Sequence, residues 1–111
     1  MHHLFIDLET FSDIDIGKAG LYKYAQSPAF RVLLFGYSLD GAPVRVVDLT
    51  QPGAYLPQEV LRWLFDRDCI KHAYNAAFEW YCLSRHFKLA EDEQHNGFSA
   101  ITWLPQWRCS M

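Results

Sequence analysis

Cysteine is scarce in this sequence and shows no pairing pattern. The three cysteines, Cys69, Cys82 and Cys109, are an odd number and form no C-x-x-C pair. Both a disulfide framework and a cysteine-based zinc site are therefore poorly supported. Free, buried thiols in a reducing compartment fit the pattern better, so we expect a cytoplasmic protein.

Long apolar runs and an excess of positive charge are also absent. No run approaches the roughly 20 apolar residues that span a bilayer, and Asp7 and Glu9 interrupt any apolar signal region near the start. We therefore expect no signal peptide and no membrane partner. The net charge of −3 argues against a module that binds nucleic acid by charge alone. An enzyme that meets phosphate through bound metal ions is still allowed, because the ions supply the positive charge.

Apolar and aromatic residues are plentiful. The 111 residues are 50% hydrophobic and 16% aromatic, which is enough for the core of one domain over residues 1–111. The sequence contains no repeat and no linker.

The apolar patterns predict an α/β fold with a mixed sheet. Asp40-Gly41 marks a hairpin between two apolar runs, and Pro57 suits the first position of a helix. The predicted order is a strand over 3–9, a loop with one helical turn over 11–30, a hairpin over 30–49, a helix over 57–65, a strand over 69–74 and a helix over 76–87. The first strand is the most apolar and must be central, beside the parallel strand over 69–74. Residues 88–97 are predicted as a polar loop, and 98–107 receive no element.

Two carboxylates stand in the strand that should be central. Asp7 and Glu9 share a strand face with Phe5, while Leu4 and its alternate neighbours face the core. Like charges side by side resist burial. Either this end of the strand is solvated, or a cation lies between the acids.

A third acid stands near the start of the second predicted helix, in "NAAFE" at 75–79. If the strand over 69–74 is parallel to the first, Glu79 lies near the same crevice at the carboxyl ends of the strands. The alternative is purely structural: Asn75 caps the helix and Glu79 complements its dipole. Three carboxylates without a soft ligand suit Mg²⁺ or Mn²⁺. Two such ions support phosphodiester cleavage. His72, His86 and His95 share no ligand spacing.

These segments resemble a known family. "FIDLET" at 5–10 looks like the first motif, and "NAAFE" the second, of the DEDD-type 3′–5′ exonucleases, which have a ribonuclease-H-like fold. The stretch over 9–41 and the terminal "WRCSM" are similar to the N-terminal exonuclease region of phage and prophage family A DNA polymerases. The resemblance covers nearly the whole chain.

The resemblance implies roles for five residues. Asp7 would bridge both metal ions, Glu9 would ligate the ion that activates the attacking water, and Glu79 would serve the second ion, through water. The backbone near Thr10 would hold the 3′-terminal nucleotide, and Asn75 would lie beside a single-stranded DNA 3′ end. Most of these exonucleases have Asp where Glu79 stands, but the phage branch commonly has Glu.

The family's third motif, a Tyr or His four residues before a metal-binding Asp, has no counterpart in this sequence. The acidic run of Glu91, Asp92 and Glu93 is best interpreted as a solvated loop. We therefore expect a fragment, truncated before the final strand and helices of the fold, with little or no activity by itself. The alternatives are an inactive ribonuclease-H-like nucleic-acid-binding module and a related nuclease that acts on RNA.

Truncation has a structural consequence. The strand over 69–74 would have an open edge, and such edges recruit other chains. We expect either self-association or a segment over 98–107 that folds back over the exposed region around Trp80 and Trp103.

Overall fold

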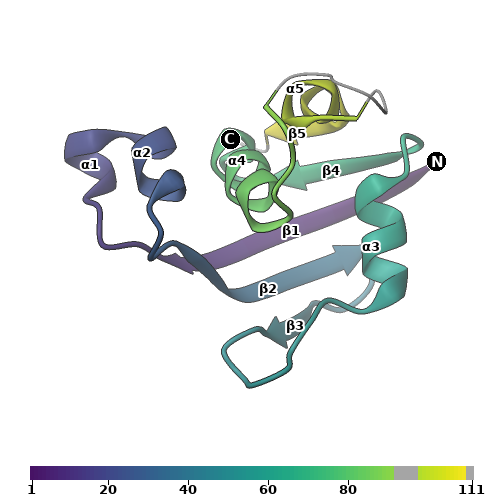
Figure 1. Cartoon of the computed structure of the whole chain (residues 1–111). Helices are drawn as coiled ribbons and strands as arrows, with labels where there is room; N and C mark the ends of the chain where they lie inside the picture. The colour runs from purple at the N-terminus through teal and green to yellow at the C-terminus, as the bar shows by residue number, and fades with distance from the viewer. Residues whose placement is uncertain (92–97, 110–111) are drawn as a thin grey trace.

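A computed structural model describes residues 1–91 and 98–109. Its centre is a five-stranded mixed sheet in the order β3-β2-β1-β4-β5 (Figure 1). β2 pairs antiparallel with β1 and β3, whereas β4 pairs parallel with β1 and β5. The strands are β1 (His2–Phe11), β2 (Arg31–Leu39), β3 (Arg45–Asp48), β4 (Cys69–Ala73) and β5 (Trp107–Cys109). This is the predicted α/β class, and its order and strand directions are consistent with a ribonuclease-H-like fold.

β1 is central, as predicted, because it pairs with both β2 and β4. Its side chains alternate between the two faces of the sheet. Leu4, Ile6 and Leu8 are buried in the core, while Phe5 and Asp7 are exposed on the other face. The predicted face assignment is therefore confirmed.

The predicted hairpin is also confirmed, with a longer loop than the sequence suggested. Asp40 and Gly41 both have positive φ angles, 52° and 81°, which is the geometry for which Asp-Gly pairs are selected in tight turns. The loop continues to Val44, and Tyr37 then pairs with Arg45. The Asp40 carboxylate accepts a hydrogen bond from the His3 backbone N–H at 2.7 Å, which ties the loop to β1.

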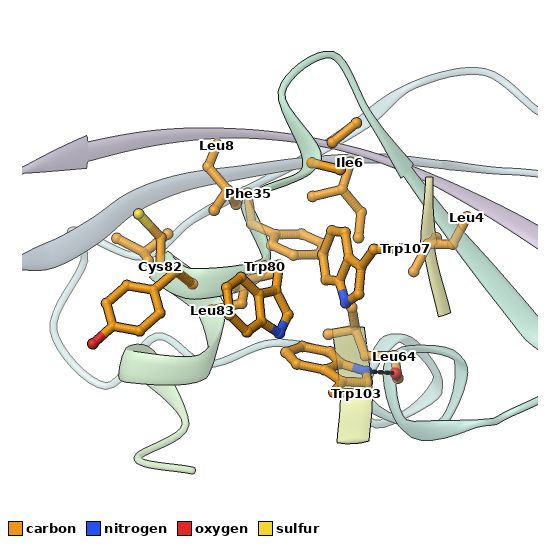
Figure 2. Close-up of a cluster of buried hydrophobic side chains, with 14 of the residues drawn as sticks. Leu4, Ile6, Leu8, Phe35, Leu64, Trp80, Cys82, Leu83, Trp103 and Trp107 are labelled. Atoms are coloured by element: carbon orange, nitrogen blue, oxygen red, sulfur yellow. Dashed lines mark hydrogen bonds between the residues drawn. The ribbon is translucent and has the colours of Figure 1, made fainter. Parts of the chain in front are cut away.

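Helices α3 (Gln58–Phe65) and α4 (Ala76–His86) pack over the face that carries Leu4, Ile6 and Leu8 (Figures 1 and 2). α3 begins one residue later than predicted, since Pro57 is its N-cap. Asn75 is the N-cap of α4, but its side chain makes no capping hydrogen bond, so the structural interpretation of this residue is wrong in that respect.

Residues 11–30 contain more structure than the single helical turn predicted. Two short helices, α1 (Ile16–Ala19) and α2 (Leu21–Gln26), are separated by Gly20. The Asp15 carboxylate accepts a hydrogen bond from the Gly17 N–H at 2.9 Å and caps α1. Gly20 has a φ angle of 90°, a conformation that favours glycine. This glycine breaks what would otherwise read as one helix.

The segment over 98–109 folds back onto the core. It forms α5 (Ala100–Trp103), the 3₁₀ helix η1 (Leu104–Gln106) and β5. The Trp80 indole N–H donates to the Ala100 carbonyl at 2.7 Å, and the Trp103 indole N–H donates to the Leu64 carbonyl at 2.9 Å (Figure 2). Of the two expected outcomes, the folded-back segment is therefore the one observed, whereas self-association stays a prediction.

β5 corrects the expectation that the sheet ends before its final strand. Lys71, His72 and Ala73 of β4 pair in parallel with residues 107–109. The edge that we expected to be open is thus covered by a strand. No sequence pattern predicts this strand, because three residues are too few to show a period.

Lys71 is fully buried beneath this segment. Its ammonium donates to the Gln106 side-chain oxygen at 2.6 Å and to the Asp66 carbonyl at 2.9 Å. Burial lowers the pKa of this lysine to about 8. The lysine thereby links β4 to η1.

Cys69 and Cys82 are buried free thiols, as expected, whereas Cys109 is exposed. None of the helices within 1–91 and 98–109 is long and apolar enough to cross a membrane. Asp92, Glu93 and His95 lie outside the described residues, as does most of the predicted polar loop over 88–97.

Candidate metal-binding carboxylate site

Asp7 and Glu9 lie on the exposed face of β1, beyond the point where β4 stops pairing with it. The last β1–β4 pair joins Phe5 to His72, while β2 continues to pair opposite both acids. The carboxyl end of β4 therefore leaves one side of β1 open next to Asp7. The chain then turns into α4 at the same end of β4.

Glu79 is in the first turn of α4, as predicted, and is only 5% exposed. Burial is the main cause that raises its pKa, to about 7, and the negative charge of Asp7 raises it further. A hydrogen bond from the backbone of Asn75 lowers it in part. A carboxyl group with a pKa this far above its usual value is a candidate for a functional role.

Of the other two predicted acids, Asp7 on β1 is near enough to Glu79 on α4 for its charge to raise the pKa of Glu79, as the second cause after burial. Glu9 lies two residues further along the same exposed face of β1. Within the described part of the chain, no group of three His, Cys, Asp or Glu side chains is arranged to hold a metal ion. Convergence of all three acids therefore stays a prediction.

Thr10 and Asn75, the predicted substrate-binding residues, lie on the two elements that carry the acids. The register of β1 against β2 shifts between Glu9 and Thr10, and the Thr10 hydroxyl lies 2.8 Å from the Tyr24 hydroxyl. This contact fixes the end of β1 against α2. Asn75 is exposed at the start of α4, where its side chain is not used for capping.

Gly36 is a feature of the site that the sequence analysis missed. It pairs with Asp7 across β1 and β2. A Cβ atom at this position would lie 3.4 Å from the Asp7 carbonyl oxygen and 3.9 Å from the Asp7 Cβ. A larger side chain would therefore crowd Asp7. A hollow of about 320 Å³ opens here, lined among others by Asp7, Gly36, His72 and Tyr74.

Comparison with known proteins gives one informative match. The chain is 46% identical over 111 residues to a DNA polymerase of Bacillus phage SP02. It is thus similar to part of a phage DNA polymerase. The match covers 99% of this chain but only 15% of the phage protein. No protein-family model and no solved structure matches the chain.

The donor chemistry of the site fits the ions predicted for it. Asp7 and Glu79 offer only carboxylate oxygens, which suit Mg²⁺ and Mn²⁺ better than softer metals. The negative charge of Asp7 disfavours ionisation of Glu79, in addition to the larger effect of burial. A divalent cation between them would relieve this repulsion and favour both charged forms. Asp7 and Glu79 therefore suit a divalent cation as ligands, and Glu9 is the next acid along β1.

Proposed function

We propose that this chain is the 3′–5′ exonuclease region of a phage-type DNA polymerase, which removes nucleotides from a single-stranded DNA 3′ end. The observation that carries the proposal is the buried Glu79, whose pKa is raised to about 7 by burial and further by the charge of Asp7. Keeping an acid buried near a second acid costs stability, and a metal-binding role would explain why the cost is tolerated. Similarity to part of a phage DNA polymerase supports the same assignment.

In this proposal the acids hold two Mg²⁺ or Mn²⁺ ions. Bound metal supplies an activated water and stabilises the charge on the leaving oxygen. Asp7 would serve as a ligand of both ions, Glu9 of the ion that activates the attacking water, and Glu79 of the second ion. Since Glu79 must be ionised to act as a ligand, binding of the ions would release its proton.

The neighbouring residues position the substrate. The backbone near Thr10, fixed by the contact of Thr10 with Tyr24, would hold the terminal nucleotide, and Asn75 would lie along the strand. Gly36 keeps the approach to Asp7 free of a side chain. Holding the scissile phosphate in one orientation is a large part of what such a site contributes to the rate.

A second candidate function is an inactive nucleic-acid-binding module with the same fold. One observation favours it: the described residues include no group of three side chains arranged around a metal ion. The two candidates differ in metal binding, because a pair of acids retained for structure alone would bind no Mn²⁺.

Two measurements test the proposal. Calorimetric titration of the chain with Mn²⁺ should detect binding that Asp7→Ala abolishes. Glu59→Gln, which changes an exposed acid, is the matched control and should leave the binding of Mn²⁺ intact. In a polymerase that carries this unit, Asp7→Ala should reduce degradation of 3′-labelled single-stranded DNA by several orders of magnitude, on the scale of a lost metal. Polymerisation should survive. Equal loss of both activities would indicate misfolding, and absence of Mn²⁺ binding would favour the inactive module.

A further inference from the structure

His3 and His72 face each other from neighbouring parallel strands. His3 Nδ1 lies 2.8 Å from His72 Nε2. Phe5 pairs with His72 across β1 and β4, so His3, two residues before Phe5, projects from the same face of the sheet. The pair is invisible in sequence spacing because 69 positions separate its members.

The two ring nitrogen atoms are joined by a hydrogen bond, which a bound metal ion would replace. Imidazole nitrogens bind zinc at about 2.0–2.1 Å, and tetrahedral coordination places two such nitrogens roughly 3.3 Å apart. The observed 2.8 Å needs to widen by only about 0.5 Å. The His3 ring is exposed, whereas the His72 ring is half-buried and stacked on Phe5, so rotation of His3 would provide most of this change.

The surroundings hold the rings in place. Phe5 stacks on the His72 ring with centroids 4.7 Å apart and an interplanar angle of 16°. The His3 backbone N–H is fixed by the Asp40 carboxylate at 2.7 Å. Burial, His3 and Arg108 together lower the pKa of His72, which keeps its imidazole in the neutral form that binds metal. The positive charge of Arg108 disfavours a bound cation, while the negative charge of Asp40 favours one.

We propose that His3 and His72 form a cross-strand site for a borderline divalent ion such as Zn²⁺, with water in the remaining positions. The site uses other ligands than the carboxylate site: His3 and Asp7 are four residues apart on one strand, which is about 13 Å, although His72 lines the same hollow as Asp7. The two sites also differ in chemistry. Paired imidazoles select Zn²⁺ over Mg²⁺, whereas carboxylates suit Mg²⁺ and Mn²⁺.

The test is calorimetric titration of the chain with ZnCl₂, and with MgCl₂ in parallel. We expect one zinc ion per chain at this site and no magnesium there. Loss of an outer-shell partner weakens metal binding by about 10- to 100-fold, so loss of a ligand should cost at least as much. His72→Gln and His3→Gln should each weaken zinc binding to this extent. His2→Gln is the matched control, since His2 pairs with Asp40 instead, and it should leave zinc affinity unchanged.

Thermal unfolding gives a second reading of the same site. A ligand that binds only the native state raises the melting temperature, so zinc should raise it for the wild-type chain and for His2→Gln but not for His72→Gln. Circular dichroism shows whether each variant is folded. If one of the two histidine variants does not fold, the other is enough for the test. Zinc binding that persists in His72→Gln, for example through the N-terminal amine and His3, would overturn the proposal. So would the absence of zinc binding by the wild-type chain.

Discussion

Glu79 is a buried carboxylic acid whose charged form is disfavoured, and this has a measurable consequence for the stability of the fold. Its pKa in the folded chain is about 7, against 4.5 for an ordinary glutamate. The native state therefore holds a proton that the unfolded state releases, and stability falls as pH rises from 4.5 to 7. At 1.36 kcal/mol per pKa unit, the penalty is about 3 kcal/mol at most.

Glu79→Gln should remove this penalty. In metal-free buffer we expect the variant to be more stable than the wild type by up to about 3 kcal/mol at pH 8 and nearly equal to it at pH 4, where the acid is neutral in both states. Denaturant unfolding at the two pH values measures the difference. Equal differences at both pH values would mean that the charge of Glu79 is not the cause. Mn²⁺ should narrow the gap at pH 8, by stabilising only the wild type.

Lys71 depends on a single side-chain acceptor, Gln106, together with the Asp66 carbonyl. Gln106→Leu should destabilise the chain by about 1.5–3 kcal/mol at pH 7, because hydrogen bonds to charged groups are worth about this much. Since the pKa of Lys71 is lowered to about 8, the ammonium becomes neutral at higher pH. The cost of the substitution should therefore shrink at pH 9.5.

Urea titrations at the two pH values check this prediction. Gln58→Leu, at an exposed position of α3, is the control and should change stability by less than about 0.5 kcal/mol. If Gln106→Leu is as mild as Gln58→Leu at pH 7, the buried lysine has found another partner, and the link between β4 and η1 is weaker than described.

At the scale of elements, the contacts of Trp103 anchor α5 to the core. The ring is fully buried and stacks on Phe65 with centroids 5.4 Å apart, while its N–H bonds the Leu64 carbonyl. Trp103→Ala should cost about 3–5 kcal/mol of unfolding free energy. Ile101→Ala, at a position of the same helix that is 53% exposed, should cost less than about 0.5 kcal/mol.

Thermal or denaturant unfolding of both variants gives the comparison. Similar small losses for the two would show that α5 contributes little to the core. A large loss for Trp103→Ala alone would show that the segment after residue 97 is part of one cooperative unit with α3 and α4.

The elements that could be predicted are those long enough to repeat a pattern. Alternation gave the core face of β1, and helical spacing gave α3 and α4 to within a residue or two. α1, α2, α5 and β5 each cover fewer than two periods of the helical or strand pattern, and Gly20 separates α1 from α2. Their existence depends on tertiary contacts such as Trp80 with Ala100.

The candidate site likewise has a part that could be predicted from the sequence and a part that could not. Asp7 and Glu9 could be chosen from alternation alone, and Glu79 from its place after a parallel strand. The effect of the Asp7 charge on Glu79, the position of Gly36 opposite Asp7, and the pair of His3 with His72 depend on how the strands and helices pack and pair. Register is set by turns and by packing between distant segments, so these features could not be obtained from spacing.

At the scale of the whole molecule, the segment over 98–109 completes both the sheet and the core. Deletion of residues 98–111 should leave the β4 edge unpaired and remove the carbonyl that the Trp80 indole N–H bonds. Exposed strand edges and apolar surface promote association. We expect the shortened chain to sediment as larger oligomers than the 111-residue chain at the same concentration, or to precipitate. Identical sedimentation of the two chains would contradict the covering role of this segment.

The central position of β1 has a consequence for synthesis on the ribosome. β1 is made first, and its antiparallel neighbour β2 follows it closely, but its parallel neighbour begins only at Cys69. At about 5–20 residues per second, this partner is made roughly 3–13 s later. During that interval the hairpin of β1 and β2 has one edge of β1, its most apolar strand, unpaired. The order of translation thus makes the first strand of this chain the one that most needs protection until the later strands leave the ribosome.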